Sequence, residues 1–243
     1  MFEVTVLPIK NVSDKKINNR TDIILPFQIE PYSLRGRFIG LSTVTTSIIK
    51  KHKYPDPVAH LLTEMLVLAP CLSSALKYDG VFTLQVSGNG PVKTLLADIT
   101  SNGELRGYAN FDTQQLTSLN LEPNVQPSLN QLTGTGYIAF TVDQGNRGER
   151  YQGIVELSNS NLVDCTHAYF RNSEQLETVI NLAVEQSAQG IWKGVAIMIQ
   201  RLGFSGGQGI PQGITEDEYD ESWRNAAIML GLSLIHISEP TRR

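Results

Sequence analysis

The apolar stretch between Val58 and Leu76 is the feature that most constrains how this chain can fold. Its apolar residues are Val58, Leu61, Leu62, Met65, Leu66, Leu68, Leu72, Ala75 and Leu76. They cover more than one side of a helix, and a helix of that kind has to be surrounded by other elements. We therefore expect a central, largely buried helix. Pro70 should kink it, because the proline ring crowds the carbonyl of Leu66.

The apolar pattern changes from helical to alternating after Asp79-Gly80. Phe82, Leu84 and Val86 fall on one side of a strand. Further segments that indicate strands are residues 92–99, 104–110, 136–142, 150–157, 178–186 and 193–202. Short turns between neighbours, such as Ser101-Asn102-Gly103, favour antiparallel pairing over a doubly wound parallel sheet.

The other segments complete the prediction of an α+β fold, with mainly antiparallel sheets packed with helices. Helices are expected at residues 42–53 and 161–175, and a polar loop at 112–133. The run from Val195 to Ile199 is apolar on both faces, which is typical of a central strand.

Four segments follow from this pattern. Residues 1–33 are rich in proline and are expected to form an irregular leading segment, followed by a single core domain at 34–202. Residues 203–231 then begin a linker with a helix at 215–230, where Thr215 and Glu218 fit a capping box. The apolar stripe of this helix consists of Tyr219, Trp223, Ala226, Ala227 and Leu230.

Residues 232–243 do not continue the pattern of that helix. They are similar to a frame translation of a sequencing-library adapter, and we expect a non-native tail there. A short genuine strand and tail is the alternative.

Composition and charge exclude several classes of protein. The 20 basic residues are scattered against 24 acidic ones, which argues against a nucleic-acid partner. No apolar run approaches the roughly 20 residues that a membrane span requires, and the first 20 residues lack the pattern of a secretory signal. The two cysteines, Cys71 and Cys165, are predicted to be reduced thiols in a cytoplasmic protein.

Candidate catalytic and metal-binding residues are few. His60 and Glu64 lie four residues apart on one helix face, but no third ligand stands at metal-site spacing. Ser74 and Lys77 match the Ser-x-x-Lys pattern of penicillin-binding enzymes, whose companion motifs are missing. Cys165 falls on an apolar helix face and is predicted to be a buried, inert thiol. We expect no catalytic residue, cofactor site or metal site in this chain.

Seven short stretches occur in the order found in a known family. They are Leu34–Arg37, His52–Val58, Leu76–Gly80, Gly88–Val92, Leu105–Ala109, Gly148–Gly153 and Tyr169–Gln175. Over residues 34–175 the sequence thus resembles the redox-regulated chaperone family known as heat-shock protein thirty-three. It departs from the family pattern at Glu177, where proline is usual, at Val195, where glycine is usual, and at Pro70.

This resemblance implies an α+β core, a linker and a small domain whose four cysteines bind zinc. Oxidation of those cysteines would release the metal, and the linker would lose structure and expose apolar surface to unfolding client proteins. Zinc is therefore expected in the intact protein but not in this chain, and neither Cys71 nor Cys165 is assigned to the cluster. Tyr219 and Trp223 are the residues expected to pack reversibly on the core or to contact clients.

The resulting hypothesis is an ATP-independent holding chaperone that binds unfolding proteins. For this chain we expect activity that does not depend on an oxidant, or else poor solubility from an uncovered apolar patch. The sequence leaves two alternatives open: an interaction or scaffold module with one fixed folded partner, and a hydrolase that uses Ser74 and Lys77. It does not separate a client surface from the core, and it leaves a dimer open.

Overall fold

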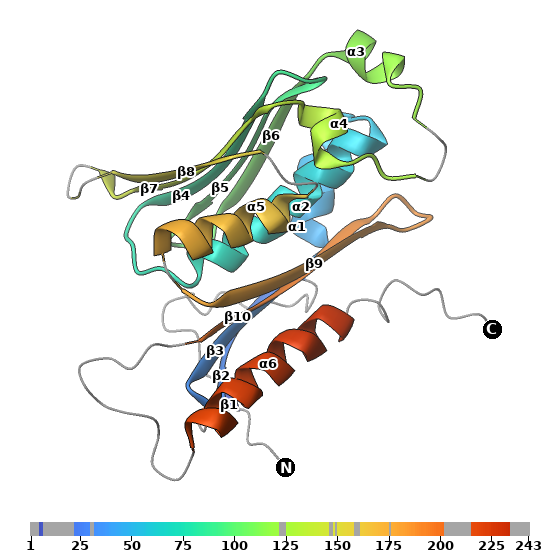
Figure 1. Cartoon of the computed structure of the whole chain (residues 1–243). Helices are drawn as coiled ribbons and strands as arrows, with labels where there is room; N and C mark the ends of the chain where they lie inside the picture. The colour runs from blue at the N-terminus through green and yellow to red at the C-terminus, as the bar shows by residue number, and fades with distance from the viewer. Residues whose placement is uncertain are drawn as a thin grey trace.

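The computed structural model describes residues 5–6, 22–29, 32–121, 125–145, 148, 150–157, 161–174, 176–201 and 215–233. Within them the strands form two antiparallel sheets of five strands each (Figure 1). The strands of the first sheet are β1 (Thr5–Val6), β2 (Ile23–Ile29), β3 (Leu34–Leu41), β10 (Trp192–Arg201) and β9 (Thr178–Gln186), in that spatial order. Those of the second sheet are β6 (Leu105–Phe111), β5 (Val92–Thr100), β4 (Val81–Gly88), β7 (Gly136–Asp143) and β8 (Tyr151–Glu156).

Helices accompany both sheets, so the predicted α+β class is confirmed. They are α1 (Thr43–Lys50), α2 (Asp56–Ser73), α3 (Thr113–Ser118), α4 (Leu129–Thr133), α5 (Leu162–Tyr169) and α6 (Glu216–Ser233). A π-helical turn, η3 (Phe170–Glu174), follows α5 directly, and together the two elements account for the helix predicted at 161–175. The strands predicted from residue 92 onward are present, and β10 is a central strand as its apolar run predicted.

Helix α2 lies between the two sheets and is the centre of the main core (Figure 1). Met65 to Ala69 have no exposed surface, which confirms the predicted buried helix. Glycines allow both sheets to approach it closely. A Cβ atom at Gly107 would lie 2.8 Å from Leu66, and one at Gly194 would lie 2.4 Å from Val67. The helix continues through Pro70 to Ser73, and the predicted kink stays a prediction.

The prediction of an irregular leading segment is wrong for residues 23–29. This stretch is strand β2, which pairs with β3 in register over its whole length. Pro26 is tolerated there because β1 opposes only Phe27 and Gln28, so the proline lies where β2 has no paired neighbour on that side among the described residues.

The predicted loop at 112–133 is also wrong in part, since it contains α3 and α4. Asp112 caps α3 by accepting hydrogen bonds from two backbone N–H groups, and Ser128 with Gln131 forms a capping box on α4. The division into core and linker stays a prediction, and from residue 234 onward the expected non-native tail lies outside the described residues.

Candidate functional site

The first sheet carries apolar side chains on both faces. Ile39, Ala196 and Met198 point toward α2 and belong to the main core. Leu34, Ile197 and Ile199 point the opposite way and belong to a second, smaller cluster. Successive residues of a strand point to opposite faces, so the apolar run in β10 supplies both clusters at once. We call the side of the first sheet that is turned away from α2 the outer face.

Pairing in the sheet defines which residues form the outer face. Ile197 stands opposite Phe38, and Phe38 stands opposite Leu25, so one apolar row crosses β10, β3 and β2. Leu25 is 41% exposed at the end of this row. The apolar residues of the outer face are Ile23, Leu25, Phe27, Ile29, Leu34, Phe38, Val179, Ala183, Val195, Ile197 and Ile199.

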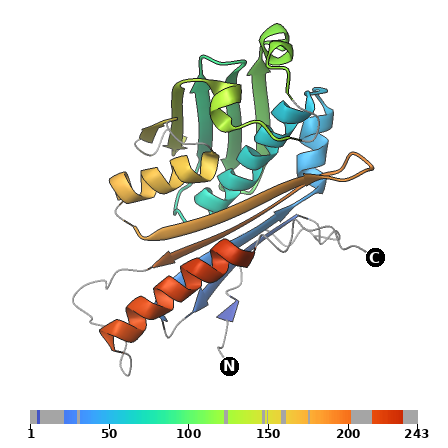
Figure 2. The same cartoon turned by 45° about the vertical axis from the view of Figure 1, so that its right-hand side comes forward.

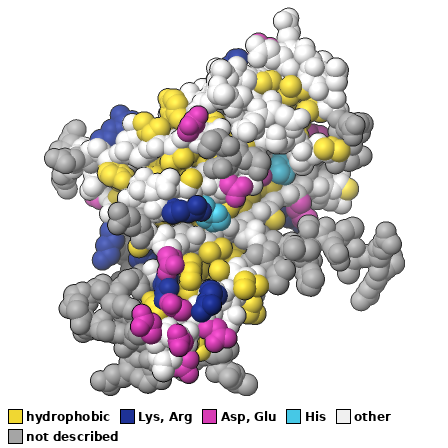
Figure 3. Space-filling view, in the orientation of Figure 1, with side chains coloured by type: hydrophobic (Ala, Val, Ile, Leu, Met, Phe, Trp, Pro, Cys, Tyr) yellow, Lys and Arg dark blue, Asp and Glu magenta, His cyan; other side chains and the backbone are white. Residues whose placement is uncertain are grey.

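Helix α6 lies along the outer face (Figure 2). Its predicted stripe is confirmed at four of five positions: Tyr219 and Leu230 are buried, and Trp223 and Ala226 pack against the second cluster. Ala227 is half-buried and does not belong to that cluster. The predicted capping box is present as well. The Thr215 backbone N–H donates to the Glu218 carboxylate at 2.8 Å, and the Glu218 N–H donates to the Thr215 hydroxyl at 3.3 Å. Acidic side chains of its first turn lie on the exposed side of the helix (Figure 3).

Two polar side chains of the first sheet hold α6 in place. The Arg201 guanidinium at the end of β10 lies 4.0 Å from the centre of the Tyr219 ring. It also donates to Asp220 of α6 and, at 2.9 Å, to Glu177. Near the other end of the helix, the Asn181 side-chain amide donates to the Leu230 carbonyl at 2.8 Å. Charge-assisted contacts of the Arg201 kind are about twice as strong as neutral hydrogen bonds.

The structure thus places both residues singled out in the sequence on the side of α6 that faces the first sheet: Tyr219 lies against Arg201, and Trp223 packs against the second cluster. Their contact with clients stays a prediction. The structure also adds residues that the sequence did not single out. Arg201 and Asn181 carried no signal, because their partners stand far along the chain. In the sequence, the outer face was indicated only by the run in β10 that is apolar on both sides of the strand.

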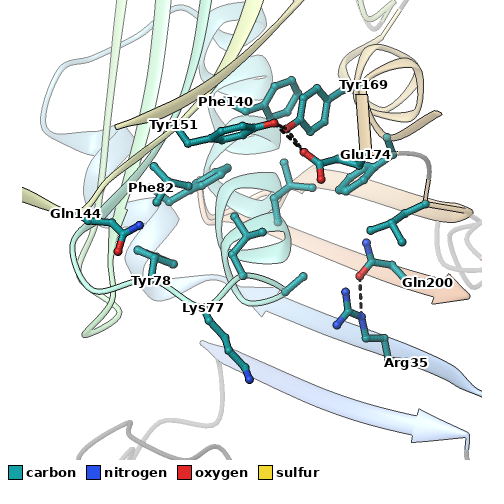
Figure 4. Close-up of a pocket in the computed structure, with 16 residues that line it drawn as sticks. Arg35, Lys77, Tyr78, Phe82, Phe140, Gln144, Tyr151, Tyr169, Glu174 and Gln200 are labelled. Atoms are coloured by element: carbon teal, nitrogen blue, oxygen red, sulfur yellow. Dashed lines mark hydrogen bonds between the residues drawn. The ribbon is translucent and has the colours of Figure 1, made fainter. Parts of the chain in front are cut away.

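The Ser-x-x-Lys pair shows no geometry of an activated nucleophile. The Ser74 hydroxyl donates to the Cys71 carbonyl at 3.1 Å, and Lys77 is exposed. In Figure 4 the Lys77 amine points away from the neighbouring cavity. The hydrolase alternative therefore has no support from the arrangement of these two side chains.

The described residues do not supply a zinc site. They contain no group of three or more His, Cys, Asp or Glu side chains that could hold a metal ion. His60 Nδ1 lies 3.9 Å from Glu64 Oε1, with no third ligand in that part of the structure. Cys71 and Cys165 are both buried, as predicted for Cys165, and the zinc of the intact protein stays an expectation. No helix in the described ranges is long and apolar enough to cross a membrane.

Fold and site together define an α+β domain. Its first sheet is apolar on both faces, and the capped helix α6 packs on the outer face. A family model described as Hsp33 protein matches residues 22–232, and the chain belongs to this family. A "33 kDa chaperonin" of Caulobacter vibrioides is 37% identical over 182 residues, which is 74% of this chain and 60% of the relative. One of Photorhabdus laumondii is 40% identical over 159 residues, or 65% of this chain and 52% of the relative.

A solved structure gives the same fold. The crystal structure of the 33 kDa chaperonin from Thermotoga maritima matches with a TM-score of 0.67 and 18% identity, and the match covers 91% of this chain and 72% of that one. In the sequence comparison, the chain spans about 60% of the length of its Caulobacter relative.

Proposed function

We propose that this chain is the client-holding part of an ATP-independent chaperone, and that the outer face of the first sheet binds apolar segments of unfolding proteins. One observation carries the proposal: among the described residues, one helix, α6, packs on the β9 and β10 side of an apolar sheet surface, which stays partly exposed at Leu25. Apolar patches of this extent on a soluble protein mark interaction sites. Unfolding proteins offer extended apolar segments of matching chemistry.

Helix α6 acts in this proposal as a reversible cover. Its contacts belong to the second cluster, whose buried residues are Leu34, Ile199 and Leu230, whereas the main core lies on the other side of the sheet. Elements attached through few buried contacts open at a lower free energy than the global unfolding of a domain. Release of α6 would expose the outer face while the main core stays folded.

Redox control is proposed for the intact protein only. The zinc-binding cysteines that the family resemblance implies have no counterpart among Cys71 and Cys165, which are buried in the main core. In this chain, the position of α6 would govern client holding. We place this activity in the cytoplasm, where both thiols would stay reduced.

The test compares two exposed apolar residues on different sheets. Leu25 on the outer face is 41% exposed, and Ile154 on the second sheet is 59% exposed. We expect Leu25→Ser to weaken the suppression of light scattering from a heat-unfolded client, and Ile154→Ser to leave it unchanged. Neither effect should depend on added ATP. Equal suppression of light scattering by the two variants would count against the proposal. A pull-down in which one native partner dominates would favour the scaffold alternative.

A further inference from the structure

A cavity of about 340 Å³ lies at the junction of the two sheets, beside the C-terminal end of α2. Its walls are largely apolar and include Leu72, Phe82, Phe140, Phe170 and Leu176 (Figure 4). A volume of this size with apolar walls and a few polar groups is typical of a small-molecule site. The cavity opens on the inner side of the first sheet and is separate from the outer face.

At one polar end of the cavity, the Glu174 side chain is already hydrogen-bonded by the protein. The Glu174 carboxylate of η3 accepts hydrogen bonds from the Tyr151 hydroxyl at 3.0 Å and the Tyr169 hydroxyl at 2.5 Å. The Tyr169 ring is in turn stacked on Phe140, with ring centres 4.3 Å apart. This carboxylate is therefore already bonded by two donors of the protein.

The other polar end carries a positive charge that is held in place. Arg35 Nε donates to the Gln200 side-chain oxygen at 3.0 Å, and the Gln200 amide donates to the Thr178 hydroxyl at 3.2 Å. Gln200 is only 1% exposed, so its orientation is fixed by packing. In Figure 4 this pair lies below Glu174, on the strands of the first sheet.

Arg35 has no ion-pair partner within the described residues. Its neighbour Arg37 forms no ion pair with a carboxylate there either. Arg37 donates instead to the backbone carbonyls of Ser74 and Gly36. Burial lowers the pKa of both guanidinium groups, and Arg35 lowers that of Arg37 further. An anion beside Arg35 would relieve both the desolvation and the repulsion.

We propose that this cavity binds a small carboxylate with an apolar body, such as a medium-chain fatty acid. The carboxylate lies against the terminal nitrogens of Arg35, and the chain extends along the aromatic wall. Arginine suits this role because its guanidinium can bind both oxygens of a carboxylate. Neutral ligands of the same length lose this contact and bind more weakly.

The experiment measures the affinity of the 243-residue chain for octanoate and for 1-octanol by calorimetry. Octanoate should bind more tightly than 1-octanol. Arg35→Gln should weaken octanoate binding roughly tenfold or more and change 1-octanol binding less than about twofold, since one charge-assisted contact is lost. Ala75→Phe, which fills the cavity, should weaken the binding of both ligands. If that variant does not fold, Leu176→Trp, at another lining residue, is used in its place.

Arg106→Gln is the matched control, because it removes the same charge from an exposed arginine of the second sheet. It should alter neither affinity. The proposal is overturned if octanoate does not bind, if octanoate and 1-octanol bind equally well, or if the filling variants retain full affinity. It is also overturned if Arg106→Gln and a folded Arg35→Gln lower octanoate affinity equally.

Discussion

Glu64 is an acidic residue on the mostly apolar central helix α2. Burial raises its pKa to about 7, and burial also lowers the pKa of His60, which lies 3.9 Å away. At neutral pH the imidazole therefore offers little positive charge to the carboxylate. Glu64 is then a group whose ionisation opposes folding.

Replacement of Glu64 should reveal this effect as a pH-dependent gain in stability. Its ordinary pKa is 4.5, so between that value and about 7 the unfolded chain releases the proton before the folded one does. The stability linked to the protonated form is thus present below pH 4.5 and is lost as the pH rises to about 7. We expect Glu64→Gln to raise the free energy of unfolding by about 2 kcal/mol more at pH 8 than at pH 5.

Urea unfolding at the two pH values measures this difference. Glu104→Gln, on an exposed turn, is the control for the loss of one carboxylate. If Glu64→Gln produced the same change at both pH values, the burial of this carboxylate would not control stability.

At the scale of the element, α6 could be predicted from the sequence while its docking surface could not. The capping residues and the apolar stripe are local and follow helical spacing. The outer face is assembled from β2, β3, β9 and β10, which lie far apart in the chain. Strand β3 gave no alternating signal because its inward positions include Arg35 and Arg37, whose hydrogen bonds to Gln200 and to the Ser74 carbonyl exist only in the folded molecule.

A break in α6 should increase client holding. Asn225 lies on the exposed side of the helix, so a substitution there leaves the apolar stripe unchanged. Asn225→Pro removes a backbone hydrogen bond and costs the helix about 3 kcal/mol, whereas Asn225→Ala favours the helix. We expect the proline variant to suppress client aggregation at lower protein concentration and to lose amide protection in α6, with protection in α2 retained.

The alanine variant should show the opposite tendency or no change. If the proline variant opened α6 without any gain in holding, α6 would not be the cover of the client surface.

At the scale of the whole molecule, both thiols lie in the main core between the sheets. Burial raises the pKa of Cys71 to about 12, although nearby Arg37 opposes the shift. Cys165 has no exposed surface. Thiols in such surroundings react slowly, because the thiolate is the reactive form.

Peroxide should therefore leave the activity of this chain unchanged. We expect equal suppression of client light scattering before and after peroxide treatment, and no labelling of Cys71 or Cys165 by a thiol reagent in the folded protein. Both cysteines should be labelled after denaturation. A strict requirement for oxidant would contradict the assignment of the redox switch to the intact protein only.

The overall class of the fold could be predicted because apolar periodicity is strong in α2 and in most strands. The sequence did not predict the first sheet as a whole, since two of its strands, β2 and β3, contain proline, glycine and arginine at positions that only tertiary pairing explains. The cavity beside α2 could not be predicted from the sequence for the same reason. Its charged ends, Arg35 and Glu174, come from segments that only the fold brings together.

The glycines that face α2 also limit how this sequence can change over evolutionary time. Gly107 of the second sheet meets Leu66, and Gly194 of the first sheet meets Val67, so neighbouring positions of one helix are held against opposite sheets. A side chain gained at either glycine demands a smaller residue on the helix in the same lineage. Positions 66 and 107, and positions 67 and 194, are thus coupled pairs in which drift at one member narrows the choices at the other.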